Sequence, residues 1–189
     1  MDIFSHGLWA GAAYKAINKK AKKPLNVWFA GFWGIFPDLF AFTITFIWLF
    51  GNIIFGGMSF SDLPHPDSVE PAPQDTLPIF RLTSLLYSIS HSAIIFLIVF
   101  GITFLIFRRP IWELGGWFIH ILLDIPTHSF QFYPTPFLWP LSGWTFDGFS
   151  WGTVWFLIPN YIAIIAVYML LRRKKKLNSA RHYPSHNIE

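Results

Sequence analysis

The sequence predicts an all-α polytopic membrane protein, a helical bundle with four membrane spans and a short N-terminal helix. The 189-residue chain is 53% hydrophobic and only 13% charged, whereas about a quarter of the residues of a soluble protein are charged. Its mean hydropathy is +0.45, and it contains 22 Phe and 10 Trp residues. Several apolar stretches also approach the roughly 20 residues that a helix needs to cross a bilayer.

Four long apolar stretches account for the predicted spans. They cover Leu25–Phe55, Leu82–Phe107, Ile111–Ile125 and Phe149–Leu171. The first stretch contains Pro37, which predicts a kinked or broken helix because proline removes a backbone hydrogen bond. The third is short and ends before Pro126, since the residue that precedes a proline disfavours helical geometry. In the last stretch, Pro159-Asn160 predicts a kink with a hydrogen-bonded amide.

A fifth apolar segment, Ile3–Ile17, is too short to span a bilayer comfortably. We expect a tilted, partly buried helix or a re-entrant one. It is unlike a signal peptide, because the cationic run Lys19–Lys23 follows the apolar segment and no small-residue cleavage site is present.

The basic residues predict the topology. They form clusters at the ends of the stretches: Lys19–Lys23, Arg108–Arg109 and Arg172–Lys176. By the positive-inside rule all three are cytoplasmic, which places the segments 56–80 and 126–148 outside. This clustering excludes a nucleic-acid-binding face.

The chain therefore divides into a membrane domain, residues 1–171 with an outer loop at 56–80, and a cytoplasmic tail, residues 172–189. We expect the tail to be disordered. Its cationic run could lie on anionic lipid, although a plain stop-transfer signal is the simpler explanation. His65, His182 and His186 lie in loop or tail and are expected to be exposed.

Ionisable residues interrupt the apolar stretches, and such residues usually mark function in a membrane protein. They are Asp38, His91, His120 and Asp124, with His6 in the N-terminal segment and His128 just past the third stretch. At 1.5 Å per helical residue, the first five lie about 16 to 25 Å from the nearest cytoplasmic cluster. In a hydrocarbon core of about 30 Å this is one layer in the outer half. We therefore expect side chains from separate helices to converge there.

The residue types favour a divalent metal. Because the chain has no Cys, ligands must be histidine nitrogen and carboxylate oxygen, which favour zinc, manganese, iron or magnesium. His120 and Asp124 are four residues apart on one helix face and could share an ion, while His128 could hang from the turn after Pro126. The alternative for His120 and Asp124 is a hydrogen bond between helices, and the alternative for His91 is a polar contact between helices. Serines beside His91 could orient its ring.

A bound metal would neutralise the carboxylates, since a buried unpaired carboxylate is strongly unfavourable. We predict one or two ions and a ligand set of His6, Asp38, His91, His120, Asp124 and His128. Asp38 and Asp124 are the candidate catalytic residues, because either could instead be the general base for a metal-activated water.

The order of these motifs resembles a known family. The motifs are an early His in an apolar helix, then Gly34–Leu39, Ser90–Ser92, the block Gly116–His128 and a Pro-rich close at Pro136–Leu141. This order is similar to that of the bacterial and archaeal inner-membrane metal-dependent hydrolases. Some of these are described as LexA-regulated, and the family is thought to be distantly similar to zinc-dependent phospholipase C.

The resemblance implies an enzyme of the cytoplasmic membrane that hydrolyses a phosphoester or lipid. It also implies zinc as the metal and the same six residues as metal-binding positions. The substrate would be a lipid or an amphiphilic small molecule, reached near the outer leaflet.

Two other hypotheses remain open from the sequence. A transporter or metal-handling protein could use the same side chains as an ion path. Such a path needs polar groups that continue toward the cytoplasmic side. The sequence offers few of them: Glu113 lies at the membrane boundary, and Thr43 and Thr45 are only weakly polar. A purely structural polar core is the third hypothesis. The sequence does not set the oligomeric state.

Overall fold

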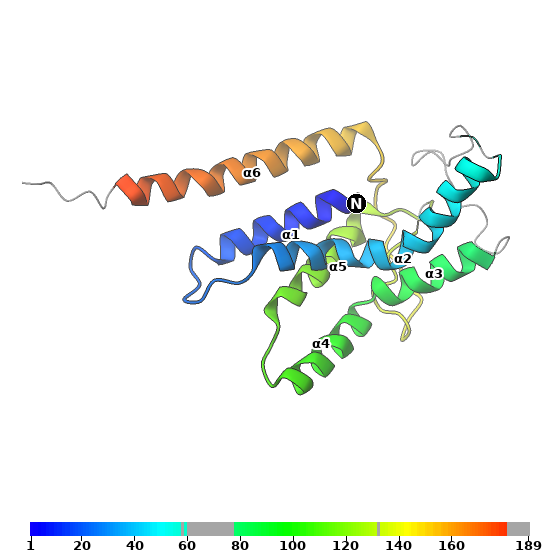
Figure 1. Cartoon of the computed structure of the whole chain (residues 1–189), viewed down its shortest axis with the longest axis horizontal. Helices are drawn as coiled ribbons and strands as arrows, with labels where there is room; N and C mark the ends of the chain where they lie inside the picture. Colours follow the sequence, from blue (N-terminus) through cyan, green and yellow to red (C-terminus); the bar gives the residue numbers. More distant parts are fainter. Residues whose placement is uncertain (58, 60–77, 132, 181–189) are drawn as a thin grey trace, which may run out of the picture.

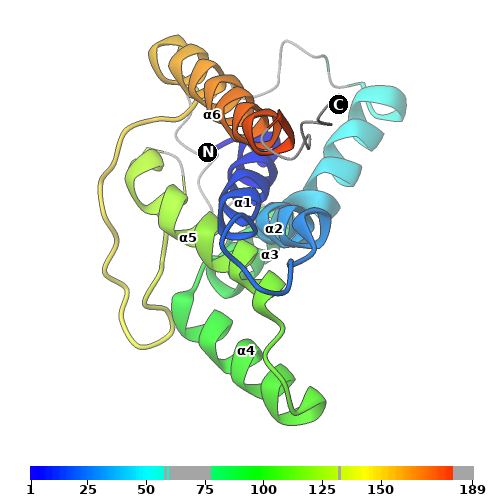
Figure 2. The same ribbon diagram turned by 90° about the vertical axis from the view of Figure 1, so that its left-hand side faces the viewer.

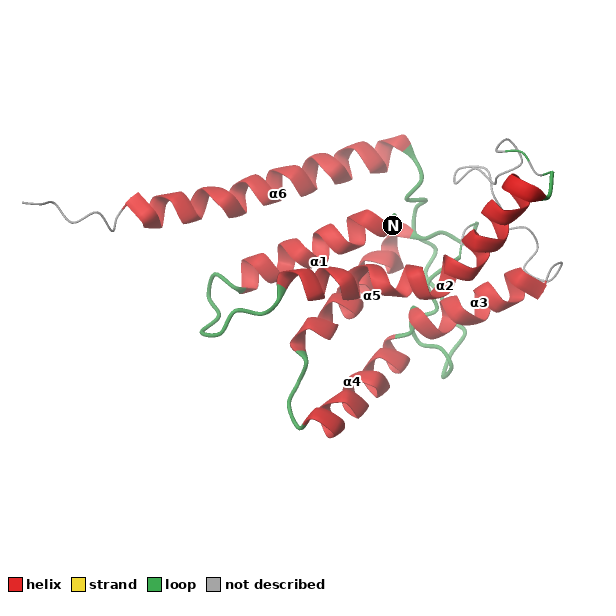
Figure 3. Cartoon of the chain, in the orientation of Figure 1, coloured by secondary structure: helices red, strands yellow, loops and turns green. Residues whose placement is uncertain are grey.

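The computed structural model describes residues 1–57, 59, 78–131 and 133–180, and within them the chain folds into helices and loops, with no strand (Figures 1 and 3). The elements are α1 Ile3–Ile17, α2 Val27–Phe55, α3 Pro78–Ser90, α4 Ala93–Phe107, a 3₁₀ turn η2 Trp112–Leu114, α5 Gly115–Thr127 and α6 Val154–Ala180. The all-α prediction is confirmed for this part of the chain, and α1 has the predicted bounds.

Two of the described helices are long and apolar enough to cross a membrane, which supports a membrane protein. They are α2 and the Val154–Arg172 part of α6, and α3 with α4 would make a third span if the bent pair crosses as one. The four predicted spans are therefore not confirmed. The α5 helix has 13 residues, and at 1.5 Å per residue its length of about 20 Å is below the thickness of the hydrocarbon core.

The predicted span Leu82–Phe107 is broken where His91 lies. Helix α3 ends at Ser90, and α4 begins at Ala93 at an angle of 61° to it. Ser92 causes the restart, because its Oγ accepts hydrogen bonds from the backbone nitrogens of Ile94 and Ile95 at 3.1 and 3.2 Å and so caps the new helix. The break leaves His91 at the bend, fully buried.

Pro37 lies inside α2 without ending it. Figures 1 and 2 show α2 changing direction between its blue N-terminal part and its cyan C-terminal part. Helix α2 therefore continues through the interruption predicted at Pro37-Asp38 and changes direction along its length (Figure 1).

Small residues allow α1, α2 and α5 to pack closely. A Cβ added at Gly34 of α2 would come within 2.7 Å of Ala10 Cβ and 2.9 Å of the His6 carbonyl oxygen in α1. At Gly116 of α5, a Cβ would lie 2.0 Å from the carbonyl oxygen of Ala30. Small residues at helix contacts let backbones approach in membrane proteins, and here they bring the polar residues of the three helices together.

Helix α6 packs on α1, which lies between α6 and α2 (Figures 1 and 2). The contact includes a buried amide: Trp9 Nε1 donates to Asn160 Oδ1 at 2.9 Å, and Asn160 Nδ2 donates to Ser5 Oγ at 2.8 Å. The predicted hydrogen-bonded amide of Asn160 is confirmed.

The disorder predicted from Arg172 does not hold for the first half of the tail, because α6 continues to Ala180. Lysine and arginine are good helix formers, and residues 172–180 contain neither proline nor glycine. His182 and His186 lie outside the described residues, as do His65 and most of the predicted outer loop 56–80.

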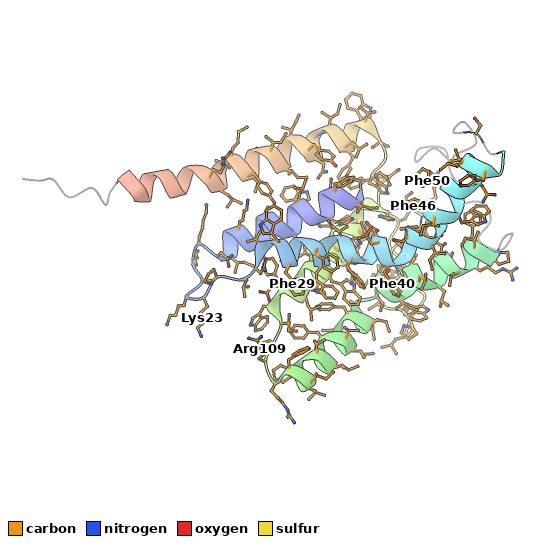
Figure 4. The ribbon with its side chains drawn as sticks, in the orientation of Figure 1. Lys23, Phe29, Phe40, Phe46, Phe50 and Arg109 are labelled. Carbon is orange, nitrogen blue, oxygen red and sulfur yellow. The ribbon has the colours of Figure 1, made fainter. Side chains whose placement is uncertain are left out.

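The outer surface of the helices is apolar and aromatic, with Phe29, Phe40, Phe46 and Phe50 each at least 40% exposed (Figure 4). Lys23 and Arg109, from two of the cationic clusters, lie at the same end of the bundle (Figure 4). This arrangement agrees with the prediction that both clusters lie on the same side of the membrane.

The close contact between α2 and α5 predicts a strong effect of Gly116→Ala. The added methyl group would overlap the Ala30 carbonyl, and overpacking of this kind costs about 1–3 kcal/mol or more. We expect a lower midpoint of thermal unfolding in detergent. Gly101→Ala is the control, because a Cβ there meets nothing within 4 Å; equal midpoints for the two variants would contradict the packing described.

Candidate metal centre

The six predicted site residues come from separate segments and are all buried at one place. His6 lies on α1, Asp38 on α2, His91 at the bend after α3, His120 and Asp124 on α5, and His128 at the C-terminal cap of α5. His6, His91, His120 and Asp124 are 0% exposed, His128 is 3% and Asp38 is 4%. The convergence expected from counting depth along each helix is therefore present in the structure.

Four of these residues form a compact group that could hold a metal ion. One ligand atom from each of Asp38, His91, His120 and Asp124 lies within 4.8 Å of the others. His91 Nε2 and His120 Nε2 are 3.0 Å apart. Asp124 Oδ2 lies 3.0 Å from His120 Nε2, and Asp38 Oδ1 lies 3.5 Å from His91 Nε2.

His6 and His128 lie on the other side of Asp124. Their Nε2 atoms are 2.9 and 3.3 Å from Asp124 Oδ1. The amino nitrogen of Met1 is in the same place, 2.5 Å from Asp124 Oδ1 and 3.0 Å from His128 Nε2. Burial lowers the pKa of His128, which favours the neutral imidazole.

Backbone carbonyls fix the protons on three of the rings. Nδ1 donates to the carbonyl oxygen of Gly34 in His120 (2.7 Å), of Tyr87 in His91 (3.1 Å) and of Tyr133 in His128 (2.9 Å). A carbonyl oxygen can only accept, so each Nδ1 carries the proton, and the Nε2 of a neutral ring then presents a lone pair. The tautomers follow from this hydrogen-bond network.

The part of the centre around His91, His120 and Asp124 Oδ2 brings several hydrogen-bond acceptors together. Two neutral rings cannot form a hydrogen bond through facing lone pairs, yet His91 Nε2 and His120 Nε2 are 3.0 Å apart. Asp38 Oδ2 and Asp124 Oδ2 are buried and accept no hydrogen bond. A cation between the two Nε2 atoms and Asp124 Oδ2 would satisfy these three acceptors, and nitrogen with carboxylate oxygen suits zinc, manganese or iron. Histidine ligands of metals usually donate their other N–H to a carbonyl or carboxylate, as these three do.

His6 is held differently. Its Nδ1 is buried without a hydrogen-bond partner, and its ring stacks on His120 with centroids 3.7 Å apart. Its Nε2 lies 3.2 Å from the carbonyl oxygen of Met1, which can only accept, so in His6 the proton is on Nε2. The position of α1 is fixed by the close contact with α2 and by the hydrogen bond from Asn160 to Ser5.

Tyr87 is a site residue that the sequence did not single out. Its ring stacks on His91 at 3.7 Å, and its hydroxyl donates to the Tyr133 carbonyl at 2.8 Å and lies 3.3 Å from His128 Nδ1. Its position four residues before His91 on one helix face is the signal that could have found it. Of the serines predicted to orient His91, Ser90 does so, with Oγ 2.9 Å from Nδ1, whereas Ser92 caps α4.

Comparisons of this chain with protein-family models, with curated proteins and with solved structures found no match.

The position of Tyr87 predicts that Tyr87→Phe weakens metal binding. The change removes the hydroxyl beside His128 and the Tyr133 carbonyl, and loss of a hydrogen bond that supports a ligand typically costs 10–100-fold in affinity. The measurement is competition for Zn²⁺ between the purified protein and a chelating dye. Tyr168→Phe is the control, since its hydroxyl bonds the Leu8 carbonyl; equal affinities for the two variants would show that Tyr87 does not support the site.

Proposed function

We propose that this protein is a membrane-embedded metal-dependent hydrolase that acts on a phosphoester or lipid-like substrate. A divalent cation, preferably zinc, would be held by His91, His120 and Asp124, with Asp38 beside it. The observation that carries the proposal is the 3.0 Å contact between His91 Nε2 and His120 Nε2, on rings whose Nδ1 atoms face carbonyls, beside buried carboxylate oxygens that accept no hydrogen bond.

The two aspartates would have different roles at such a site. When bound, the cation would lower the pKa of water toward 7 and polarise a phosphoryl or carbonyl oxygen. Both oxygens of Asp124 face histidine Nε2 atoms, which assigns Asp124 to ligation. Asp38 keeps Oδ2 without a hydrogen-bond partner, so we assign Asp38 as the general base that takes the proton from water.

The surroundings support a lipid or amphiphile as substrate. The exposed surface of the helices is apolar, so molecules dissolved in the bilayer reach it without crossing water. The resemblance to inner-membrane metal-dependent hydrolases supports the same substrate class, a cytoplasmic-membrane location in a bacterium or archaeon, and a cytoplasmic C-terminal tail.

A transporter is less well supported because the buried polar side chains do not continue from the site toward the end of the bundle where the cationic clusters lie. Among the described residues they belong to the segments 5–6, 38–45, 83–92, 120–135 and 160. In the parts of the helices that lead toward the cationic clusters, Tyr14 is the buried residue with a hydroxyl, and it donates to the Trp112 carbonyl. An ion path would need polar groups on both sides of the site.

Metal content of the purified protein tests the proposal. We expect bound zinc in the wild-type protein and its loss in Asp124→Asn, because the amide cannot supply the negative charge. Asp147→Asn is the control, since Asp147 accepts from the Phe130 backbone nitrogen at an exposed position. A metal-free wild-type protein that remains folded would refute the metal site. Metal-dependent ion flux in proteoliposomes without hydrolysis of any ester would favour the transporter.

A second variant separates ligation from catalysis. We expect Asp38→Asn to retain bound metal and to lose about 10²–10⁴-fold in the rate of ester hydrolysis, the usual contribution of general base catalysis. Metal content and rate are measured on the same preparation, with a panel of phospholipids and short-chain phosphoesters as substrates. A metal-loaded Asp38→Asn protein with the wild-type rate would remove Asp38 from the catalytic role.

A further inference from the structure

The segment between α5 and α6, residues 129–153, is aromatic and almost uncharged. Nine of its 25 residues are Phe, Tyr or Trp, and Asp147 is its one charged residue. Its described residues form neither helix nor strand. Several of its large apolar side chains are exposed: Phe130 59%, Leu141 77%, Trp144 56%, Phe146 45% and Phe149 51%. Exposed apolar side chains gathered in one segment indicate an apolar partner.

Both ends of this aromatic loop lie at one height in the predicted bilayer. Thr127, the last residue of α5, lies 18 positions after Arg109. Val154, the first residue of α6, lies 18 positions before Arg172. At 1.5 Å per helical residue each path is about 27 Å. Both arginines belong to clusters predicted to lie on one side of a hydrocarbon core of about 30 Å, so the loop begins and ends near the opposite boundary.

The backbone and the side chains of the aromatic loop need different surroundings. Irregular backbone cannot pair all of its N–H and C=O groups with one another, which excludes the hydrocarbon core. The exposed Phe, Trp and Leu side chains are favoured by removal from water. The headgroup region meets both needs, because it is hydrated and also accommodates aromatic rings.

The second half of the aromatic loop is tied to the end of α5. The backbone nitrogen of Gly148 donates to the His128 carbonyl at 2.9 Å, and the Asp147 carboxylate accepts from the Phe130 backbone nitrogen at 2.9 Å. A Cβ at Gly148 would lie 2.3 Å from the Pro126 carbonyl oxygen, so this close approach requires glycine. Figure 2 shows the loop, in yellow, extending beside α5 and returning to the start of α6. The loop is therefore held at the height where α5 ends.

We propose that the aromatic loop is a lipid-docking surface in the headgroup region of the leaflet opposite the cationic clusters. Its exposed side chains would lie among the upper parts of the acyl chains. Phospholipid of either headgroup charge fits, since the one charged group, the Asp147 carboxylate, already accepts a backbone hydrogen bond. The proposal depends on a membrane-spanning chain and not on a bound metal, so it holds or fails independently of the proposed function.

Spin labels measure the depth of the aromatic loop directly, because the chain has no native Cys. Phe130→Cys and Leu141→Cys are each labelled with a nitroxide in the full-length protein, in vesicles of palmitoyl-oleoyl phosphatidylcholine. Both side chains are more than half exposed, so the label needs little space within the fold. Power saturation compares the accessibility of the label to O₂, which concentrates in hydrocarbon, with its accessibility to a water-soluble nickel chelate.

Two further labels give the reference values. Lys22→Cys lies at an exposed position before α2 and reports water. Ile162→Cys lies within α6, where the side chain is 62% exposed, and reports hydrocarbon. We expect both loop labels to give a ratio of O₂ to nickel accessibility between these two references.

Three results would overturn the docking surface. A ratio equal to that of Lys22→Cys would place the loop in water. A ratio equal to that of Ile162→Cys would place it in hydrocarbon. Low accessibility to both reagents would show that protein, such as a second copy of the chain, covers the loop.

Discussion

The need to neutralise a buried cluster of acceptors is the constraint on which the rest of this structure depends. Asp38 and Asp124 are removed from water, and the neutral rings of His91, His120 and His128 present lone pairs on Nε2 because backbone carbonyls hold their protons on Nδ1. An uncompensated buried charge costs several kcal/mol, against a total stability of about 5–15 kcal/mol for a folded protein. A bound cation removes this cost, whereas protonated histidines would have to form on Nε2 and turn the cluster into ion pairs.

Helices α1, α2 and α5 and the bend after α3 each contribute a side chain to this cluster. Glycines at the contacts of α2 with α1 and α5 let the backbones approach, and the carbonyl oxygen of Gly34 at this contact is the acceptor for His120. The break between α3 and α4 places His91 at a bend, where its ring reaches the cluster. The loop after α5 returns to supply the Tyr133 carbonyl to His128. The packing of the helices and the orientation of the buried histidine rings therefore depend on some of the same residues.

The sequence predicted the helical class, the bounds of α1 and the convergence of the six polar residues. The length of each apolar stretch and the depth of each polar residue in the membrane can both be counted from the sequence. It did not predict the break at His91, since a serine inside an apolar stretch can be interior or can cap a new helix, as Ser92 does. The supporting carbonyls of Gly34 and Tyr133 have no signature, because every residue has a carbonyl. The roles of the six residues as ligands remain a prediction.

The central claim is that histidine Nε2 atoms in this buried centre bind a metal ion. X-ray absorption at the zinc edge, on protein purified with its metal, tests this claim directly. We expect a first shell of nitrogen and oxygen at about 2.0–2.2 Å, outer-shell scattering from at least two imidazole rings, and no sulfur, in agreement with a chain that has no Cys. A spectrum of oxygen ligands without imidazole scattering, or a folded protein without metal, would contradict it.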